Sequence, residues 1–179
     1  MILPITQYGN PVLRKKCARV DKVTDEVREL AQNMDETMRD AQGIGIAAPQ
    51  VGVALQLAIV DVSHDPECFS YLRVDGEDTA LEDLMPLVFI NPELTFGKRK
   101  ELEQEGCLSI QEVNAKVRRP ADVTAKLTLL DGRTITVEAD GLLSRAIQHE
   151  TDHLNGVLFT DRVSPATKLS VQRKLKALV

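Results

Sequence analysis

Two of the three histidines in this 179-residue chain lie four residues apart, in His149-Glu150-Thr151-Asp152-His153. The residues around them, 141–154, are expected to form a helix, with Asp140 as its cap and Asn155-Gly156 ending it in residue types that favour a left-handed conformation. Side chains at positions i and i+4 of a helix point the same way, so both imidazoles can bind one metal ion. Glu150 then leans toward the open coordination position, where a carboxylate can transfer protons for a metal-bound water.

The competing interpretation is a pair of surface histidines that lie beside acidic residues by chance. Histidine is scarce in this chain, and the flanking Ala146, Ile147 and Leu154 are apolar. The pair is therefore expected in a partly buried place, where polar groups without a ligand would be costly. The pattern favours a metal site.

A catalytic metal of this kind needs a third protein ligand and an open position for water. Cys107 is the candidate, within the turn-prone window Glu105-Gly106-Cys107-Leu108-Ser109. The three cysteines are odd in number and widely spaced, which argues against a disulfide framework and leaves a thiol free for chemistry. Free cysteine is often simply a small buried hydrophobe, and the spacing alone leaves these two interpretations even.

Composition excludes several classes of protein. With 43% hydrophobic and 27% charged residues, the chain has ordinary globular usage, and one domain over residues 1–179 is expected. A net charge of −5 provides no basic field for a nucleic-acid substrate. No apolar run approaches the roughly 20 residues of a membrane span, and the start lacks a secretory signal, so we expect a cytoplasmic protein without membrane contact.

Hydrophobic periodicity predicts both helices and strands. The predicted helices are a short one from Asn10-Pro11 to about Cys17, a longer one capped by Thr24 with an apolar stripe to Met38, and a last one from Ser164-Pro165. The predicted strands are 54–62, 87–90 and a hairpin over 123–137. A cleft-lining loop is expected at 42–50, and a solvated acidic excursion without a catalytic role at 64–86.

Three windows, Gly43–Gln50, Glu105–Ser109 and Gln148–Gly156, resemble in order the three signature motifs of peptide deformylases. The resemblance covers nearly the whole chain, and only the acidic excursion looks longer than in compact members. It implies an α+β fold, with antiparallel strands packed around the helix that carries the two histidines. It also implies a metal-dependent hydrolase that removes the formyl group from the N-terminal formyl-methionine of newly synthesised polypeptides and releases formate.

The same resemblance assigns catalytic roles. Cys107, His149 and His153 would hold one divalent metal, Fe2+ being the usual ion of the family, while thiolate and imidazole ligands would also accept Zn2+, Ni2+ or Co2+. Hydroxide formed on the metal would attack the formyl carbon, with Glu150 taking the proton from the water and giving it to the leaving amine. The Gln50 side chain and the Leu108 backbone N–H would stabilise the oxyanion.

Substrate-binding residues are also implied by family position. Gly43 and Gly45 would let an N-formylmethionyl nascent peptide approach the backbone, although a tight turn is the simpler role for both. The remaining substrate-binding candidates are Ile44, Glu105 through its apolar part, Gly106, Leu142 and Ala146. Substrate preference stays open, because Gln111 stands where the family commonly has a proline after the cysteine motif, and Asn114 and Arg145 stand near positions that often help shape the pocket mouth.

Two other functions and one additional partner compete with these expectations. A zincin-type protease would need a downstream Glu or His ligand, and the 26 residues after His153 contain neither. A non-catalytic metal-binding module would not need Glu150 or Gln50. The basic residues of the last helix suit contact with the ribosome, although a solvated charged face is the favoured interpretation of such a pattern.

Overall fold

The computed structural model describes residues 1–66, 68 and 70–179. Its helices are α1 (Asp25–Asp40), α2 (Leu81–Leu84), α3 (Gly141–Leu154) and α4 (Pro165–Lys176), with short 3₁₀ helices η1 (Pro11–Arg14), η2 (Ala48–Val51) and η3 (Phe159–Asp161). Its strands are β1 (Gly45–Ala47), β2 (Leu57–Val60), β3 (Leu72–Val74), β4 (Glu77–Asp78), β5 (Leu87–Phe96), β6 (Lys100–Cys107), β7 (Ile110–Pro120), β8 (Asp122–Thr128) and β9 (Thr134–Asp140).

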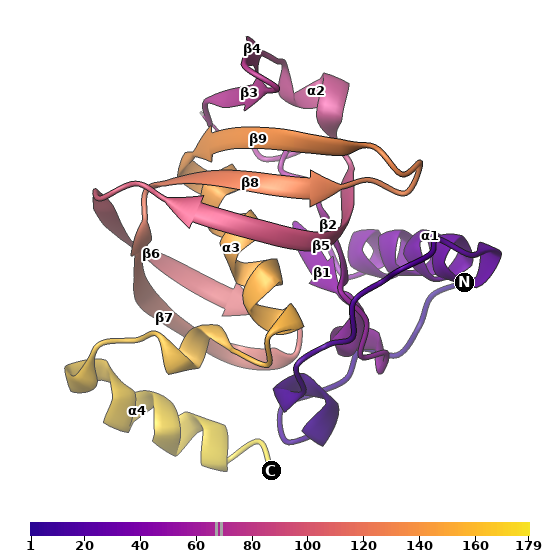
Figure 1. The fold of residues 1–179 in the computed structure, drawn as a ribbon. Helices are drawn as coiled ribbons and strands as arrows, with labels where there is room; N and C mark the ends of the chain where they lie inside the picture. The colour runs from indigo at the N-terminus through magenta and orange to yellow at the C-terminus, as the bar shows by residue number, and fades with distance from the viewer. Residues whose placement is uncertain (67, 69) are drawn as a thin grey trace.

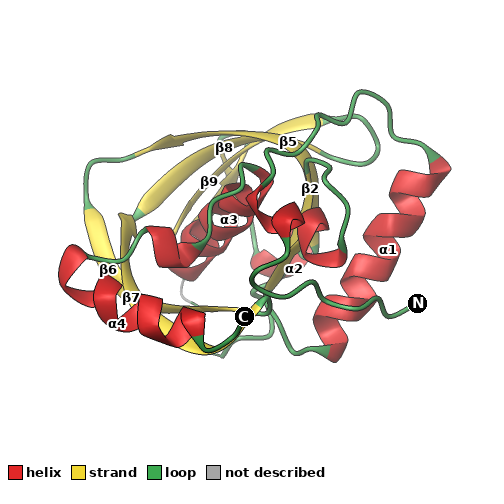
Figure 2. Cartoon of the chain, turned by 90° about the horizontal axis from the view of Figure 1, so that it is seen from below, coloured by secondary structure: helices red, strands yellow, loops and turns green. Residues whose placement is uncertain are grey.

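Two antiparallel sheets surround α3. Seven strands form one sheet in the order β1-β2-β5-β8-β9-β3-β4, and β6 and β7 form a separate hairpin. Figure 1 shows α3 behind β5 and β8, and Figure 2 shows it enclosed between the large sheet and the β6–β7 hairpin. This arrangement confirms the expected α+β fold around the histidine helix. Among the described residues, no helix is both long and apolar enough to cross a bilayer.

Strand β2 is buried on both faces, which explains its unbroken apolar sequence. Ala58 and Val60 pack in the core that includes Leu143 and Ile147 of α3. Leu57 and Ile59 belong to a second core, with the apolar stripe of α1. Successive side chains of a strand point to opposite faces, so this strand joins α1 to α3 through the sheet.

A third core fixes the β6–β7 hairpin. Val113 and Val117 of β7 pack with Phe159 of η3 and with Val171 and Leu175 of α4. The segment that follows α3 therefore returns across the hairpin and holds it in place.

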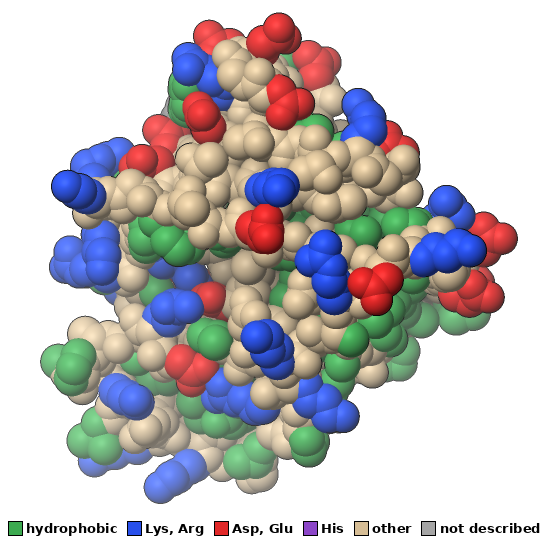
Figure 3. Space-filling model, in the orientation of Figure 1, with side chains coloured by type: hydrophobic (Ala, Val, Ile, Leu, Met, Phe, Trp, Pro, Cys, Tyr) green, Lys and Arg blue, Asp and Glu red, His purple; other side chains and the backbone are tan. Residues whose placement is uncertain are grey.

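The acidic excursion is more structured than expected. Strands β3 and β4 and helix α2 lie within residues 64–86, β3 pairs with β9, and Leu72 is buried. The sequence did not predict these elements, because the alternation needed for pairing is too short to stand out among acidic residues. The acidic character is exposed as expected, and Figure 3 shows it gathered over β3, β4 and α2. Residues 67 and 69 of the excursion lie outside the described residues.

The excursion also caps the histidine helix. Asp140 occupies the predicted N-cap position, but its carboxylate accepts from the Tyr71 backbone N–H at 2.6 Å and makes no cap hydrogen bond. The Ser70 hydroxyl oxygen accepts instead from the Leu143 N–H at 3.0 Å. A residue distant in sequence thus satisfies one of the free N–H groups at the start of α3.

Other boundaries differ from the sequence-based expectations. The first predicted helix is only the 3₁₀ turn η1, and the predicted cleft-lining loop contains β1 and η2. Strand β5 continues past Asn91-Pro92 through a bulge, because the Asn91 side chain bonds to the N–H and C=O of Val20 and supports a left-handed backbone there. The β6–β7 hairpin was not predicted.

Asp61 anchors the chain beside β1. Its buried carboxylate accepts from the Ser63 N–H at 3.0 Å, the Ser63 hydroxyl at 2.6 Å and Arg39 Nη2 at 3.0 Å. Burial alone would raise the pKa of Asp61, but these hydrogen bonds outweigh it and lower the pKa below 3.8. A lowered carboxyl pKa stabilises the fold above the unfolded value, and this stabilisation is lost as pH falls through the folded value.

We therefore expect Asp61→Ala to lower the free energy of unfolding by about 1.5–3 kcal/mol at neutral pH, the usual worth of hydrogen bonds to a charged group. In urea unfolding, the difference from the parent should shrink as the pH falls below 3.8. Asp21→Ala is the control, since Asp21 is exposed and its pairing with Arg19 is long, at 3.8 Å. An Asp61→Ala effect that is independent of pH would contradict the assignment.

Candidate metal centre and catalytic cleft

The three predicted metal ligands meet in space. One ligand atom from each of Cys107, His149 and His153 lies within 4.8 Å of the other two. Cys107 Sγ is 3.4 Å from His153 Nε2. Ligands of a tetrahedral metal with ordinary metal–sulfur and metal–nitrogen bonds are separated by roughly 3.4–3.6 Å. The Cys107–His153 pair already has this separation, and the whole group is compact enough to hold one ion.

The β6–β7 hairpin brings Cys107 to α3. The strand register shifts between Glu105 and Cys107, and Cys107 then pairs with Ile110 across a tight turn. A Cβ at Gly106 would meet the end of the Asn114 side chain, so glycine leaves room for the Asn114 amide beside this turn. The turn thus carries the thiol to the histidine pair.

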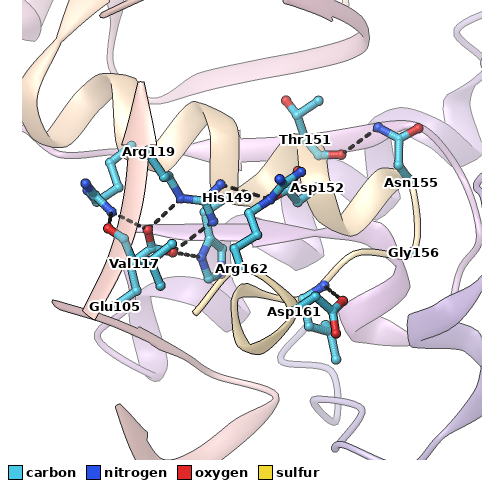
Figure 4. A network of polar contacts seen from close by, with 12 residues as sticks. Glu105, Val117, Arg119, His149, Thr151, Asp152, Asn155, Gly156, Asp161 and Arg162 are labelled. Atoms are coloured by element: carbon cyan, nitrogen blue, oxygen red, sulfur yellow. Dashed lines mark hydrogen bonds and ion pairs between the residues drawn. The ribbon is translucent and has the colours of Figure 1, made fainter. Parts of the chain in front are cut away.

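The orientation of His149 is set by Glu105. His149 Nδ1 lies 2.9 Å from Glu105 Oε1, which leaves Nε2 as the nitrogen for a metal. The buried carboxylate also accepts from Arg119 Nε at 2.6 Å and Nη2 at 2.9 Å (Figure 4). It accepts from Arg145 Nη1 at 2.6 Å as well. Burial would raise the pKa of Glu105, but the hydrogen bonds with His149 and Arg119 lower it to about 2.

Sequence reasoning had missed most of this arrangement. It placed only the apolar part of Glu105 at the pocket, it did not consider Arg119, and it placed Arg145 near the pocket mouth. Arg145 does line the cleft, but it is buried and held by the carbonyls of Val117 and Glu101 at 2.8 and 2.9 Å. Arg119 lies on β7 and Arg145 on α3, and no sequence pattern indicated that either would pair with a buried carboxylate.

The two histidines differ in their proton affinity. Burial lowers the pKa of His153 well below its ordinary value, which favours the neutral imidazole that binds a metal. Burial also opposes protonation of His149, but Glu150, Cys107 and Glu105 outweigh it and raise the pKa of His149. A cation that binds this cluster must therefore displace a proton from it.

Glu150 is buried beside the cluster. Burial is the main reason that the pKa of Glu150 rises to about 7. Its Oε1 atom is buried and has no hydrogen-bond partner within the described part of the chain. A buried carboxyl oxygen without a protein partner is costly, and a metal-associated water or a substrate group fits the chemistry that it lacks.

Gln50 is held with its amide N–H groups toward the thiol. Its Oε1 accepts from the Ala47 N–H at 2.9 Å, and its Nε2 donates to Ser109 Oγ at 3.1 Å and lies 3.5 Å from Cys107 Sγ. Helix η2 carries Gln50 directly after β1, and the residue is 1% exposed. This places a fixed donor beside the group formed by Cys107, His149 and His153.

A cleft of about 390 Å³ opens onto this cluster. Its lining includes all but one of the predicted site residues, namely Gly43, Ile44, Gly45, Gln50, Glu105, Gly106, Cys107, Leu108, Leu142, Ala146, His149 and Glu150. His153 is outside the lining and is 1% exposed. Gln42, Gln104 and Arg145 also line the cleft.

Gly45 allows Glu150 to lie against the backbone of β1. A Cβ at Gly45 would be 2.8 Å from Glu150 Cδ and closer still to Oε2. The φ angle of Gly45 is not positive, so a tight turn is not what requires glycine here. At Gly43 a Cβ would meet only the end of the Leu108 side chain, at 2.9 Å.

Known proteins match this chain over nearly its whole length. A family model described as "Polypeptide deformylase" matches residues 2–169. A peptide deformylase of Methylacidiphilum infernorum is 43% identical over 99% of this chain and 93% of the relative. "Peptide deformylase 2" of Gloeobacter violaceus is 46% identical over 95% of this chain and 83% of the relative.

Solved structures agree with the sequence comparisons. The peptide deformylase of Synechococcus elongatus, in complex with actinonin, has a TM-score of 0.81 at 40% identity, covering 98% of this chain and 85% of that chain. The Ehrlichia chaffeensis enzyme has a TM-score of 0.83 at 30% identity, covering 99% of this chain and 97% of that one.

Binding of Co2+ tests the metal cluster directly. We expect the parent protein to bind about one Co2+ per chain and to show a thiolate-to-cobalt charge-transfer band, because Cys107 supplies one ligand. Cys107→Ser should abolish the band, whereas Cys68→Ser should retain it, since Cys68 bonds to Ser70 and lies outside the cluster. A band that survives Cys107→Ser would exclude this thiol as a ligand.

Proposed function

Because this chain belongs to the polypeptide deformylase family of metal-dependent hydrolases, we propose that it removes the formyl group from the N-terminal formyl-methionine of newly synthesised polypeptides and releases formate. The observation that carries the proposal is one cleft that contains Cys107, His149, Gln50 and Glu150, with His153 beside it. The family match over residues 2–169 supports a single domain over residues 1–179.

Cys107, His149 and His153 would hold one divalent ion, which when bound would polarise the formyl carbonyl and lower the pKa of a neighbouring water. Fe2+ is the proposed ion in the cell, and Zn2+, Ni2+ or Co2+ could replace it, since thiolate and imidazole accept all four. Glu105 keeps the His149 ring in one orientation and leaves Nε2 free for the ion.

Glu150 would move the proton. A carboxyl with a pKa of about 7 can both accept and donate a proton near neutral pH, which suits general acid–base chemistry. Glu150 takes a proton from the attacking water and gives it to the amine nitrogen as the formyl C–N bond breaks. The products are formate and a free N-terminus, without a covalent enzyme intermediate.

Two donors would stabilise the oxyanion of the tetrahedral intermediate, the Gln50 amide and the Leu108 backbone N–H. The bonds from Ala47 and to Ser109 fix the Gln50 amide before substrate arrives, so little reorganisation is needed in the transition state. A single donor of this kind contributes roughly 3 kcal/mol.

The substrate peptide would bind in extended form. Strand β1, which contains Gly45, is an edge strand of the large sheet, and a peptide can add to such an edge through main-chain hydrogen bonds. The methionine side chain would lie against the apolar lining of the cleft. The residues proposed for this contact are Ile44, Leu142, Ala146, the aliphatic part of Glu105 and Gly106.

A cytoplasmic location and contact with the ribosome stay predictions from the sequence. The exposed basic residues that motivate ribosome contact lie on α4, namely Lys168, Arg173, Lys174 and Lys176. Nascent N-formylmethionyl chains are the proposed partners in either case.

Formate release from formyl-Met-Ala-Ser tests the function. The parent, purified anaerobically, should contain about one metal per chain and release formate. Glu150→Ala should keep the metal and lose activity by about 10²–10⁴-fold, the usual contribution of general acid–base catalysis. Glu93→Ala is the control, since Glu93 is exposed and pairs with Lys126. A metal-loaded parent without formate release would refute the proposal in favour of a non-catalytic metal-binding protein.

Gly45→Ala tests the close approach of Glu150 to β1. We expect kcat to fall by about 10²-fold or more, because the new methyl group displaces the carboxylate that transfers the proton. Gly43→Ala should reduce kcat less, since the Leu108 side chain can rotate away. Metal content should stay at the parental level in both variants. A parental kcat in Gly45→Ala would contradict this prediction, because it would show that catalysis does not need the close approach of Glu150 to β1.

A further inference from the structure

An ordered chain of charged side chains runs from the surface to His149 (Figure 4). Arg162 donates to Asp152 through Nε at 2.6 Å and Nη2 at 2.8 Å. Arg119 Nη1 donates to the same carboxylate at 2.9 Å. The other nitrogens of Arg119 hold Glu105, whose Oε1 lies 2.9 Å from His149 Nδ1.

Arg119 is the rigid link in this chain. Its planar guanidinium donates to Glu105 on one side and to Asp152 on the other, so its orientation depends on both carboxylates. The Arg119 and Glu105 side chains are 3% and 5% exposed, and that of Asp152 is 13% exposed. In such a place of low dielectric constant, a displaced carboxylate is poorly compensated by water.

Arg162 fixes the outer end of the chain. It follows η3 and lies outside the catalytic cleft, and its side chain is 45% exposed. Its two-pronged contact fixes the rotation of Asp152, which a single bond from Arg119 would leave freer. Arg145 gives Glu105 a second anchor, so loss of Arg162 weakens the arrangement without dismantling it.

We propose that Arg162 is a positioning residue for His149, acting through Asp152, Arg119 and Glu105. Arg162 touches no reacting atom. It sets the direction of His149 Nε2 and thereby the retention of the metal and the rate of the chemical step. The inference rests on the proposed metal centre.

A simpler explanation has to be separated from this one. Phe159 of η3 stacks on the His149 ring, with ring centroids 6.1 Å apart, so general loosening of η3 would also disturb the histidine. Arg14 provides a matched control for that effect. It bonds to Asp161 of η3 at 2.6 Å and is also 45% exposed, but its bond to Asp161 does not continue to Asp152 or Glu105.

The test compares the zinc-loaded holoproteins of the parent, Arg162→Ala, Arg162→Lys and Arg14→Ala. The readouts are the rate of zinc release to a chelator, kcat and KM on formyl-Met-Ala-Ser, and the melting temperature of the metal-free proteins. Arg162→Ala should release zinc about tenfold faster and lose kcat about tenfold, with KM little changed, as for other residues that support a metal ligand. Arg162→Lys should have a zinc-release rate and a kcat between those of the parent and Arg162→Ala, because lysine keeps the charge and loses the two-pronged contact.

Arg14→Ala should release zinc at the parental rate, and both alanine variants should have similar metal-free melting temperatures. Asp152→Asn should also release zinc faster, and adding Arg162→Ala to it should have little further effect, since the two residues act on one path. The inference would be overturned if Asp152→Asn and Arg162→Ala had additive effects on the rate of zinc release. It would also be overturned if Arg14→Ala and Arg162→Ala released zinc equally fast, or if Arg162→Ala kept the parental zinc release and kcat. A parent that binds no zinc would instead refute the metal centre itself, and the positioning role with it.

Discussion

The buried carboxylate of Glu105 is the constraint on which the site depends. It carries a full charge in the interior, with a pKa of about 2, and it is compensated by Arg119, Arg145 and His149. Burial of an isolated carboxylate would be prohibitive, so these partners cannot move independently. Because Glu105 lies on β6, Arg119 on β7 and the other two on α3, the same group joins the hairpin to the helix and orients His149, one of the proposed metal ligands.

The surrounding fold makes this geometry rigid. Helix α3 is packed against the large sheet, and β2 is sandwiched between α3 and α1. The excursion caps the start of α3 through Ser70, while η3 and α4 hold the hairpin from the other side. The proposed metal ligands thus come from a helix and from the end of a strand, where packing limits motion more than it does in a loop.

The proposed proton transfer and the packing of the core place opposite demands on Glu150. Burial against Gly45 disfavours its charged form and raises its pKa to about 7, which costs stability and gives the carboxyl a proton affinity suited to neutral pH. Glu105 is also buried but keeps its charge, because hydrogen bonds with His149 and Arg119 lower its pKa to about 2. The two buried carboxyls of one site therefore have different pKa values, because His149 and Arg119 favour the charged form of Glu105 whereas burial dominates at Glu150.

The sequence by itself determined the features that depend on local spacing. Helical periodicity gave α1 and α3, strand alternation gave the hairpin over 123–137, and the i and i+4 spacing placed His149 and His153 on one face. The arginine partners were decided only by tertiary structure, because Arg119 meets Glu105 across 14 residues and Asp152 across 33. The interaction of a buried charge with its partners depends on their distance in the folded structure, and no local sequence pattern shows which arginine will lie close to it.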